Sequence, residues 1–306
     1  MNSMDLIVLA AGLGSRFGAL KQVQAIDEKG HYILDYSIHD AVDAGFDRII
    51  FVVSKDSEEF IRGEFMDRAR EYCYNRGVEF AFVRQDMDPR FQEISPGRTK
   101  PLGTAHAVMC CNKKVRGTYV TINADDYYGP ETFRVAADFI RNNNNCEYYG
   151  CVAFRAGNTL SENGAVKRGI CKVVDGNIVE IIESSVERSG PETVNAVPLD
   201  GSPAFETTDT VPVSMNMFIM PMDTMDEFLQ RYEEFLENME DPSSAEYLLP
   251  DVISEMVSDG IGRLRLIESP ETWYGLTYKT DLEPLRDAIS GMIASGQYDE
   301  DLWKDL

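Results

Sequence analysis

Histidine and paired cysteines are scarce in this chain. Three histidines and six cysteines are spread over 306 residues. No two cysteines form a Cys-x-x-Cys pair, and His31, His39 and His106 are scattered, which argues against a structural zinc site. So low a density of thiols is typical of proteins of the reducing cytosol and not of disulfide-stabilised scaffolds.

Long apolar runs are also missing. The first residues, MNSMDLIVLAAG, lack the basic flank and the long apolar stretch of a signal peptide. The run DLIVLAA is as long as a buried strand and far short of the roughly 20 residues needed to span a bilayer. We therefore expect a cytoplasmic protein that does not enter a membrane.

Positive charge is in short supply. The 29 Lys and Arg residues face 52 Asp and Glu residues, so the formal net charge is −23. A surface this negative argues against nucleic acids and anionic membranes as partners. An anionic small-molecule substrate remains possible, because a few local cations can dominate one pocket.

The first half of the chain alternates between apolar runs and helical patterns. With 43% hydrophobic residues, a packed globular body is expected. The alternation predicts a doubly wound α/β sheet, with strands at 5–11, 48–54, 78–85 and 118–126 and helices at 33–46, 57–77 and 103–115. In such sheets ligands bind beyond the carboxyl ends of the strands. The glycines after the first strand, Gln85 and the pair Asp125 and Asp126 all fall at such ends.

The second half changes character. Longer strands are predicted at 148–156, 169–184 and 211–221, with a hairpin turn at Asp175-Gly176, and helices are predicted at 224–240 and 245–260. Residues 184–212 are rich in Ser, Pro, Gly, Thr and acids, so we expect a surface loop there. We expect one domain over 1–281, with a nucleotide-binding half (1–130) and an acceptor-binding half (131–281). A C-terminal helical segment over 282–306 follows, either as a contact in a homo-oligomer or as a solvated helix.

A glycine-rich loop follows the first strand. Gly12, Gly14 and Gly18 allow the backbone to bend tightly and to present N–H groups to an anion. Their spacing matches neither the dinucleotide fingerprint nor a Walker A loop. Arg16 and Lys21 add two cations, which together favour a polyphosphate site. The alternative is a tight turn with two solvated bases.

Two adjacent carboxylates, Asp125 and Asp126, follow the fourth predicted strand. Their repulsion is most easily offset by a divalent cation. Mg²⁺ keeps most of its waters and takes one or two protein carboxylates plus phosphate oxygens, so the pair suits a nucleotide–metal site. The alternative is an acidic loop in an acidic chain.

A family resemblance joins these features. The chain resembles the nucleotidyltransferases that make nucleoside-diphosphate sugars or related activated alcohols, in the segments LAAGLGSRFGALKQ, ILDYSIHDAVDAGFDRIIFVVS, PLGTAHAV, NADDYYG, IVEIIES, VSMNMFIMP, EYLLPDVI and TWYGLTYKTDL. They occur in the family's order over nearly the whole chain. The resemblance implies a Rossmann-like α/β/α fold with a mixed, mainly parallel central sheet. It also implies Mg²⁺-dependent transfer of a nucleoside monophosphate from a nucleoside triphosphate to a sugar 1-phosphate or a similar phosphomonoester, with release of pyrophosphate.

The resemblance also implies a role for each matching position. Arg16 would stabilise the leaving pyrophosphate, and Lys21 would contact the phosphates at the reacting centre. The remaining positions would hold the nucleotide (Ala11, Gly12, Gly14, Gln85, Gly103 and Thr104), the metal ion (Asp125 and Asp251) and the acceptor (Gly169, Glu183 and Asn216).

One departure concerns the acceptor. The family often has Glu-Lys-Pro where this chain has Glu183-Ser184-Ser185, and the missing lysine usually touches the acceptor phosphate. Lys172 and Lys279 are candidate substitutes. Acceptor and nucleobase therefore stay open. Two other functions stay open as well: a metal-dependent GT-A-like glycosyltransferase, against which the Arg16 and Lys21 loop argues, and a non-catalytic nucleotide-binding protein.

Overall fold

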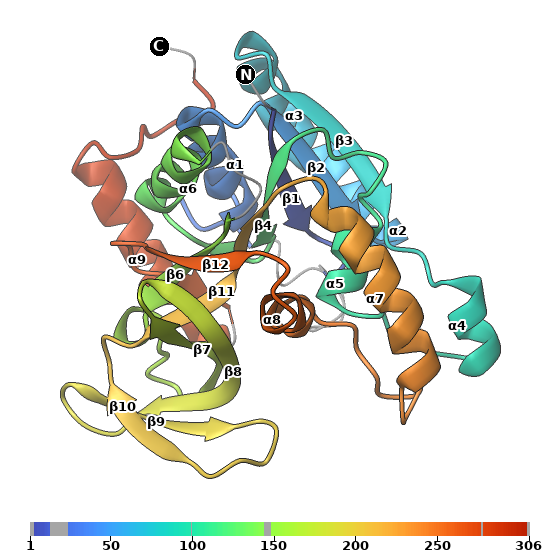
Figure 1. Ribbon diagram of the computed structural model, residues 1–306. Coiled ribbons are helices and arrows are strands. Elements are labelled where there is room, and N and C mark those ends of the chain that lie inside the picture. Colours follow the sequence, from blue (N-terminus) through green and yellow to red (C-terminus); the bar gives the residue numbers. More distant parts are fainter. Residues whose placement is uncertain (1–2, 13–23, 99, 144–147, 277, 305–306) are drawn as a thin grey trace.

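A parallel four-stranded unit forms the first part of the central sheet (Figure 1). The computed structural model describes residues 3–12, 24–98, 100–143, 148–276 and 278–304. The four strands lie in the order β3-β2-β1-β4 and are all parallel: β1 (Met4–Leu9), β2 (Arg48–Val53), β3 (Glu79–Arg84) and β4 (Thr118–Asn123). This confirms the predicted alternation of strands and helices.

Helices cover both faces of these strands. One layer contains α1 (Ile33–Ala44), α3 (Met66–Asn75) and α6 (Pro130–Asn142), and the other contains α5 (Thr104–Met109), α7 (Thr224–Asn238) and α8 (Leu249–Ser258). Successive β1 side chains alternate between them: Leu6 and Val8 pack in the first core and Ile7 in the second. Continuous apolar runs therefore become strands here because both faces are buried.

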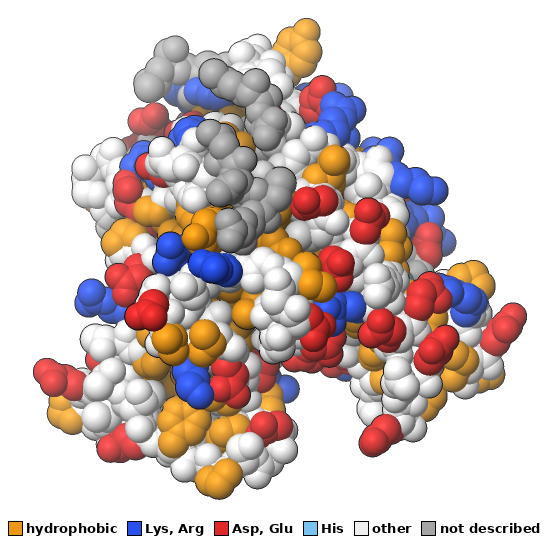
Figure 2. All heavy atoms as spheres, viewed as in Figure 1, with side chains coloured by type: hydrophobic (Ala, Val, Ile, Leu, Met, Phe, Trp, Pro, Cys, Tyr) orange, Lys and Arg blue, Asp and Glu red, His pale blue; other side chains and the backbone are white. Residues whose placement is uncertain are grey.

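The predicted helix over 57–77 is divided in three. It comprises α2 (Lys55–Phe60), a π-helical turn (Ile61–Phe65) and α3. The short α4 (Pro89–Ile94) follows β3. Acidic side chains gather over α7 on the face seen in Figure 2.

Strands of mixed direction extend the sheet beyond β4. They are β6 (Tyr148–Arg155), β7 (Val166–Val174), β8 (Asn177–Arg188), β9 (Thr193–Pro198), β10 (Phe205–Thr208), β11 (Pro212–Met220) and β12 (Arg263–Glu268). β12 runs parallel to β6, and the other pairs in this part are antiparallel. A separate two-stranded sheet joins β5 (Asp126–Tyr127) to β13 (Tyr274–Gly275).

The predicted hairpin turn is confirmed, and the predicted loop is wrong. Asp175 and Gly176 both have positive φ, 50° and 74°, as a two-residue hairpin requires. Within 184–212, however, β8 continues to residue 188, and β9 and β10 add two strands to the sheet. Val194 and Ala196 are buried at alternate positions, so a period of two hidden by polar neighbours defines β9.

The C-terminal segment packs on the chain's own first helix. After a short 3₁₀ turn (Lys279–Asp281), α9 (Leu282–Ala294) is helical as expected, whereas residues 295–304 are not. The Tyr298 hydroxyl donates to Asp40 Oδ2 at 2.7 Å, and the Trp303 indole donates to Asp35 Oδ1 at 2.9 Å. Both acceptors belong to α1, which ties the end of the described chain to the first half of the sequence.

The structure bears on two further expectations, which concern membrane spans and the pairing of cysteines. Within the described residues, no helix combines the length and the apolar character that a membrane span needs. The cysteines that the structure describes (Cys73, Cys110, Cys111, Cys151 and Cys171) are free thiols, and Cys146 lies outside the described residues.

Candidate active site

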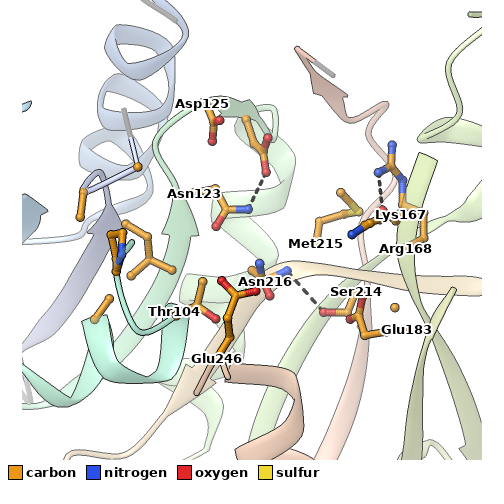
Figure 3. Close-up of a pocket in the computed structure, with 18 of the residues that line it drawn as sticks. Thr104, Asn123, Asp125, Lys167, Arg168, Glu183, Ser214, Met215, Asn216 and Glu246 are labelled. Carbon is orange, nitrogen blue, oxygen red and sulfur yellow. Dashed lines mark hydrogen bonds between the residues drawn. The ribbon is translucent and has the colours of Figure 1, made fainter. Parts of the chain in front are cut away.

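A cavity of about 620 Å³ opens where β1 and β4 end. It is lined by most of the predicted site residues: Ala11, Gly12, Gln85, Gly103, Thr104, Asp125, Gly169, Glu183 and Asn216. In Figure 3, Asp125 lies on one side of the cavity, Glu183 lies on the other, and Asn216 lies between them. Gly14, Arg16 and Lys21 fall outside the described residues.

The Gly103 turn is joined to the segment that precedes α8. Gly103 has φ = 106°, and a Cβ at this position would lie 2.5 Å from the Tyr247 carbonyl oxygen. The Tyr247 N–H donates to Leu102 O at 2.6 Å, and the Leu249 N–H donates to Thr104 Oγ1 at 2.9 Å. Only glycine combines this backbone conformation with so close an approach. The Thr104 oxygen is thus engaged by the protein, and its hydroxyl hydrogen remains available to a ligand.

Gln85 braces the same turn. Its Nε2 donates to Gly103 O at 2.8 Å and lies 3.3 Å from His106 Nδ1. Burial lowers the pKa of His106, so the imidazole is neutral near pH 7 and Nδ1 can accept a hydrogen bond. Because a carbonyl oxygen only accepts, the Gln85 nitrogen must face Gly103. The amide oxygen Oε1 is then the group that Gln85 can offer to a ligand.

Oxygen donors gather at the end of β4. Asp125, Asp126 and Asn123 all line the cavity. Asn123 Nδ2 donates to Asp126 Oδ2 at 2.8 Å, which orients that carboxylate (Figure 3). Among the residues that the structure describes, no three acidic, histidine or cysteine side chains come together closely enough to hold a metal ion by themselves. Hard oxygen donors in this number fit Mg²⁺, which completes its shell with water and substrate phosphates.

A β-bulge turns Asn216 into the cavity. The pairing of β11 with β6 shifts between Ser214 and Phe218, and Asn216 has φ = 62°, in the left-handed region. Thr121 on β4 holds the bulge, because its hydroxyl donates to Asn216 O at 2.6 Å and accepts from the Phe218 N–H at 3.2 Å. Bulges commonly re-aim a side chain next to an active site.

Gly169 makes room for Glu183 on the facing strand. The two residues are direct partners in the β7–β8 ladder, and a Cβ on Gly169 would lie 2.8 Å from Glu183 Oε1. Burial raises the pKa of Glu183, and the negative charge of Asp251 raises it further, while Lys167 and Arg168 act in the opposite direction. The carboxylate therefore lies in a partly dry site that suits the hydroxyl groups of a ligand.

Asp251 is the described candidate that does not line the cavity. It lies exposed in the first turn of α8. Its effect on the pKa of Glu183 shows that it is within electrostatic reach of the cavity wall.

Sequence reasoning missed several cavity residues, above all Lys167 and Arg168. They directly precede Gly169, which is the signal that could have found them. Lys172, one of the predicted substitutes for the missing lysine, instead pairs with Glu180 at 3.4 Å and does not line the cavity. The side chain of Lys279, the other one, falls outside the described part of the structure.

The chain was compared with protein families, curated proteins and solved structures. Residues 6–274 match the family model described as Nucleotidyl transferase. A putative glucose-1-phosphate thymidylyltransferase from Bacillus anthracis, crystallised with sucrose, has a similar structure (TM-score 0.59, 15% identity, 94% of this chain and 95% of the other covered). So does the inositol-1-phosphate CTP transferase from T. maritima (TM-score 0.61, 14% identity, 96% and 97% covered). At these identities the two structures show the shared fold. No curated protein matches the sequence.

Proposed function

The chain belongs to the nucleotidyl transferase family, and from that premise we propose that it transfers a nucleoside monophosphate from a nucleoside triphosphate to the phosphomonoester of a sugar or similar alcohol, releasing pyrophosphate. The observation that carries the proposal is that one cavity brings Gly12 and Asp125 together with Gly169, Glu183 and Asn216. The phosphates of the nucleotide and of the acceptor can thus approach each other in a cavity lined by residues of both halves of the chain. The two similar structures are a putative glucose-1-phosphate thymidylyltransferase and an inositol-1-phosphate CTP transferase, which supports a polyhydroxylated acceptor.

The reaction requires neutralisation of negative charge more than it requires covalent catalysis. An oxygen of the acceptor phosphate attacks the α-phosphorus, a new P–O bond forms, and the bond to the bridging oxygen of pyrophosphate breaks. A phosphate oxygen is already ionised near neutral pH, so no general base is needed. Positioning and neutralisation of crowded negative oxygens then account for most of the acceleration.

On the nucleotide side, the backbone at Ala11 and Gly12 would hold the triphosphate, together with Gly14. Arg16 would neutralise the leaving pyrophosphate, and Lys21 would bridge the two reacting phosphates. Gln85 Oε1 would accept a hydrogen bond from the base beside the Gly103-Thr104 turn.

On the acceptor side, Gly169, Glu183 and Asn216 would bind the hydroxyl groups of the alcohol. Asp125 would hold Mg²⁺ together with the substrate phosphates, and Asp251 remains the predicted second ligand. When bound, Mg²⁺ neutralises phosphate charge and orders the α-phosphate.

The test is a matrix of nucleoside triphosphates against sugar, polyol and choline phosphates, scored by pyrophosphate release with Mg²⁺ and with EDTA. We expect at least one combination to release pyrophosphate in a Mg²⁺-dependent way. Triphosphate binding without release in every combination would support a non-catalytic protein. Transfer of a sugar from a nucleoside-diphosphate sugar would support a glycosyltransferase.

A further inference from the structure

The acceptor side of the cavity carries positive charge that the family resemblance does not explain. The basic residues that line the described cavity are Lys100, Lys167 and Arg168. Lys100 pairs with Glu246 at 2.9 Å. Lys167 is exposed, and its positive charge opposes the rise in the pKa of Glu183. In a chain with a net charge of −23, Lys167 thus adds an exposed positive charge to the cavity wall.

Position 184, where the family often has its lysine, carries an uncharged serine in this chain. Successive residues of a strand point to opposite faces, so Ser184 points away from the face that carries Glu183. Ser184 is fully buried, and its hydroxyl donates to Ile182 O at 3.1 Å.

Lys167 lies on the same face of this ladder as Glu183. It pairs directly with Ser185, one same-face step from the pair formed by Gly169 and Glu183. Lys167 and Glu183 are therefore diagonal neighbours, a spacing that long side chains bridge. In Figure 3 Lys167 and Glu183 lie on the same side of the cavity.

Arg168 fixes the backbone at this point. Its side chain is 5% exposed. The guanidinium donates to Lys167 O at 2.7 Å, to Thr159 Oγ1 at 2.9 Å and to Thr159 O, and it lies 4.5 Å from the centre of the Trp273 ring. Burial lowers the pKa of Arg168 to about 10, so it keeps its charge at neutral pH. The nearby carboxylates of Asp126, Asp281 and Glu183 oppose the effect of burial and favour the charged guanidinium.

We propose that Lys167 binds the phosphate of the acceptor, in place of the lysine of Glu-Lys-Pro, and that Arg168 is the positioning residue that holds the Lys167 backbone. This assignment rests on the proposed function. The cation that binds the acceptor phosphate would thus come from β7, the strand next to β8, which carries Glu183.

The first test is steady-state kinetics of pyrophosphate release with the best acceptor from the matrix. Lys167→Ala should raise the acceptor KM about tenfold or more, because it removes a charge-assisted hydrogen bond, and should leave the KM of the triphosphate within about twofold. Lys172→Ala is the matched control, since Lys172 is an exposed lysine of the same strand outside the cavity. It should behave as wild type.

A charge transplant tests the geometry. In the double variant K167S/S185K the cation moves to the directly opposite residue on the same face, so the acceptor KM should recover part of its loss. Arg168→Lys should raise the acceptor KM more than the triphosphate KM. Equal losses on both substrates would give Arg168 a merely structural role and overturn its part of the proposal.

Two failures can be told apart. An active wild type whose Lys167→Ala variant keeps the acceptor KM overturns the assignment of Lys167 alone. A wild type that releases no pyrophosphate with any acceptor overturns the proposed function and this inference together.

Discussion

The strained residue Asn216 allows backbone geometry to be separated from ligand binding. Its φ of 62° lies in the left-handed region, which glycine adopts freely and asparagine tolerates. Alanine there costs about 1 kcal/mol relative to glycine. Asn216→Ala should therefore lower the free energy of unfolding by about 1 kcal/mol, whereas Asn216→Gly should stay near wild type.

The two variants should differ in stability but lose activity to a similar extent. Both variants lose the side-chain amide that we assign to the acceptor. A neutral hydrogen bond contributes about 0.5–1.5 kcal/mol, so both should lose about two- to tenfold in kcat/KM for the acceptor. Urea denaturation measures the first quantity, and pyrophosphate release at varied acceptor concentration measures the second. Full activity in Asn216→Gly together with a loss in Asn216→Ala would show that Asn216 acts through the backbone only.

Three further predictions address the metal, the turn and the fold. Asp125→Asn should weaken Mg²⁺ dependence and activity together, and an unchanged metal titration would remove Asp125 from the metal site. Gly103→Ala should destabilise the protein by at least about 1 kcal/mol in thermal unfolding, because its Cβ would lie 2.5 Å from the Tyr247 carbonyl oxygen. Burial raises the pKa of Asp27, but hydrogen bonds from His31 and Tyr36 outweigh it and lower the pKa to about 2. This group stabilises the fold above pH 4 and loses its effect as the pH falls toward 2, so Asp27→Asn should cost about 2 kcal/mol at pH 7 in urea titrations and progressively less below pH 4.

Strands whose two faces are both buried could be predicted from their continuous apolar sequence. The apolar runs at β1 and β2 predict strands because helices cover both faces of the sheet, and Gly45 ends α1 in the left-handed conformation that glycine adopts freely. In β9 the inward residues Val194 and Ala196 are separated by polar ones, so composition alone predicted a loop.

The acceptor side depends on register, which is harder to predict. From the turn at Asp175-Gly176, an unbroken hairpin would pair Lys167 with Ser184. A shift between Lys172 and Val173 moves the pairing by one residue, so Lys167 lies opposite Ser185 instead. One irregular residue therefore decides which side chains share the face of Glu183, and no periodicity in the sequence reveals it.

The most direct test of the account follows the phosphorus atom itself. A nucleoside triphosphate labelled at the α-phosphorus is incubated with Mg²⁺ and the phosphomonoester acceptor, and the products are separated. We expect the label to appear in a diphosphate-linked conjugate of nucleoside and alcohol, with one pyrophosphate released per conjugate. Label that stays in the triphosphate with every acceptor, despite saturable binding, would contradict it.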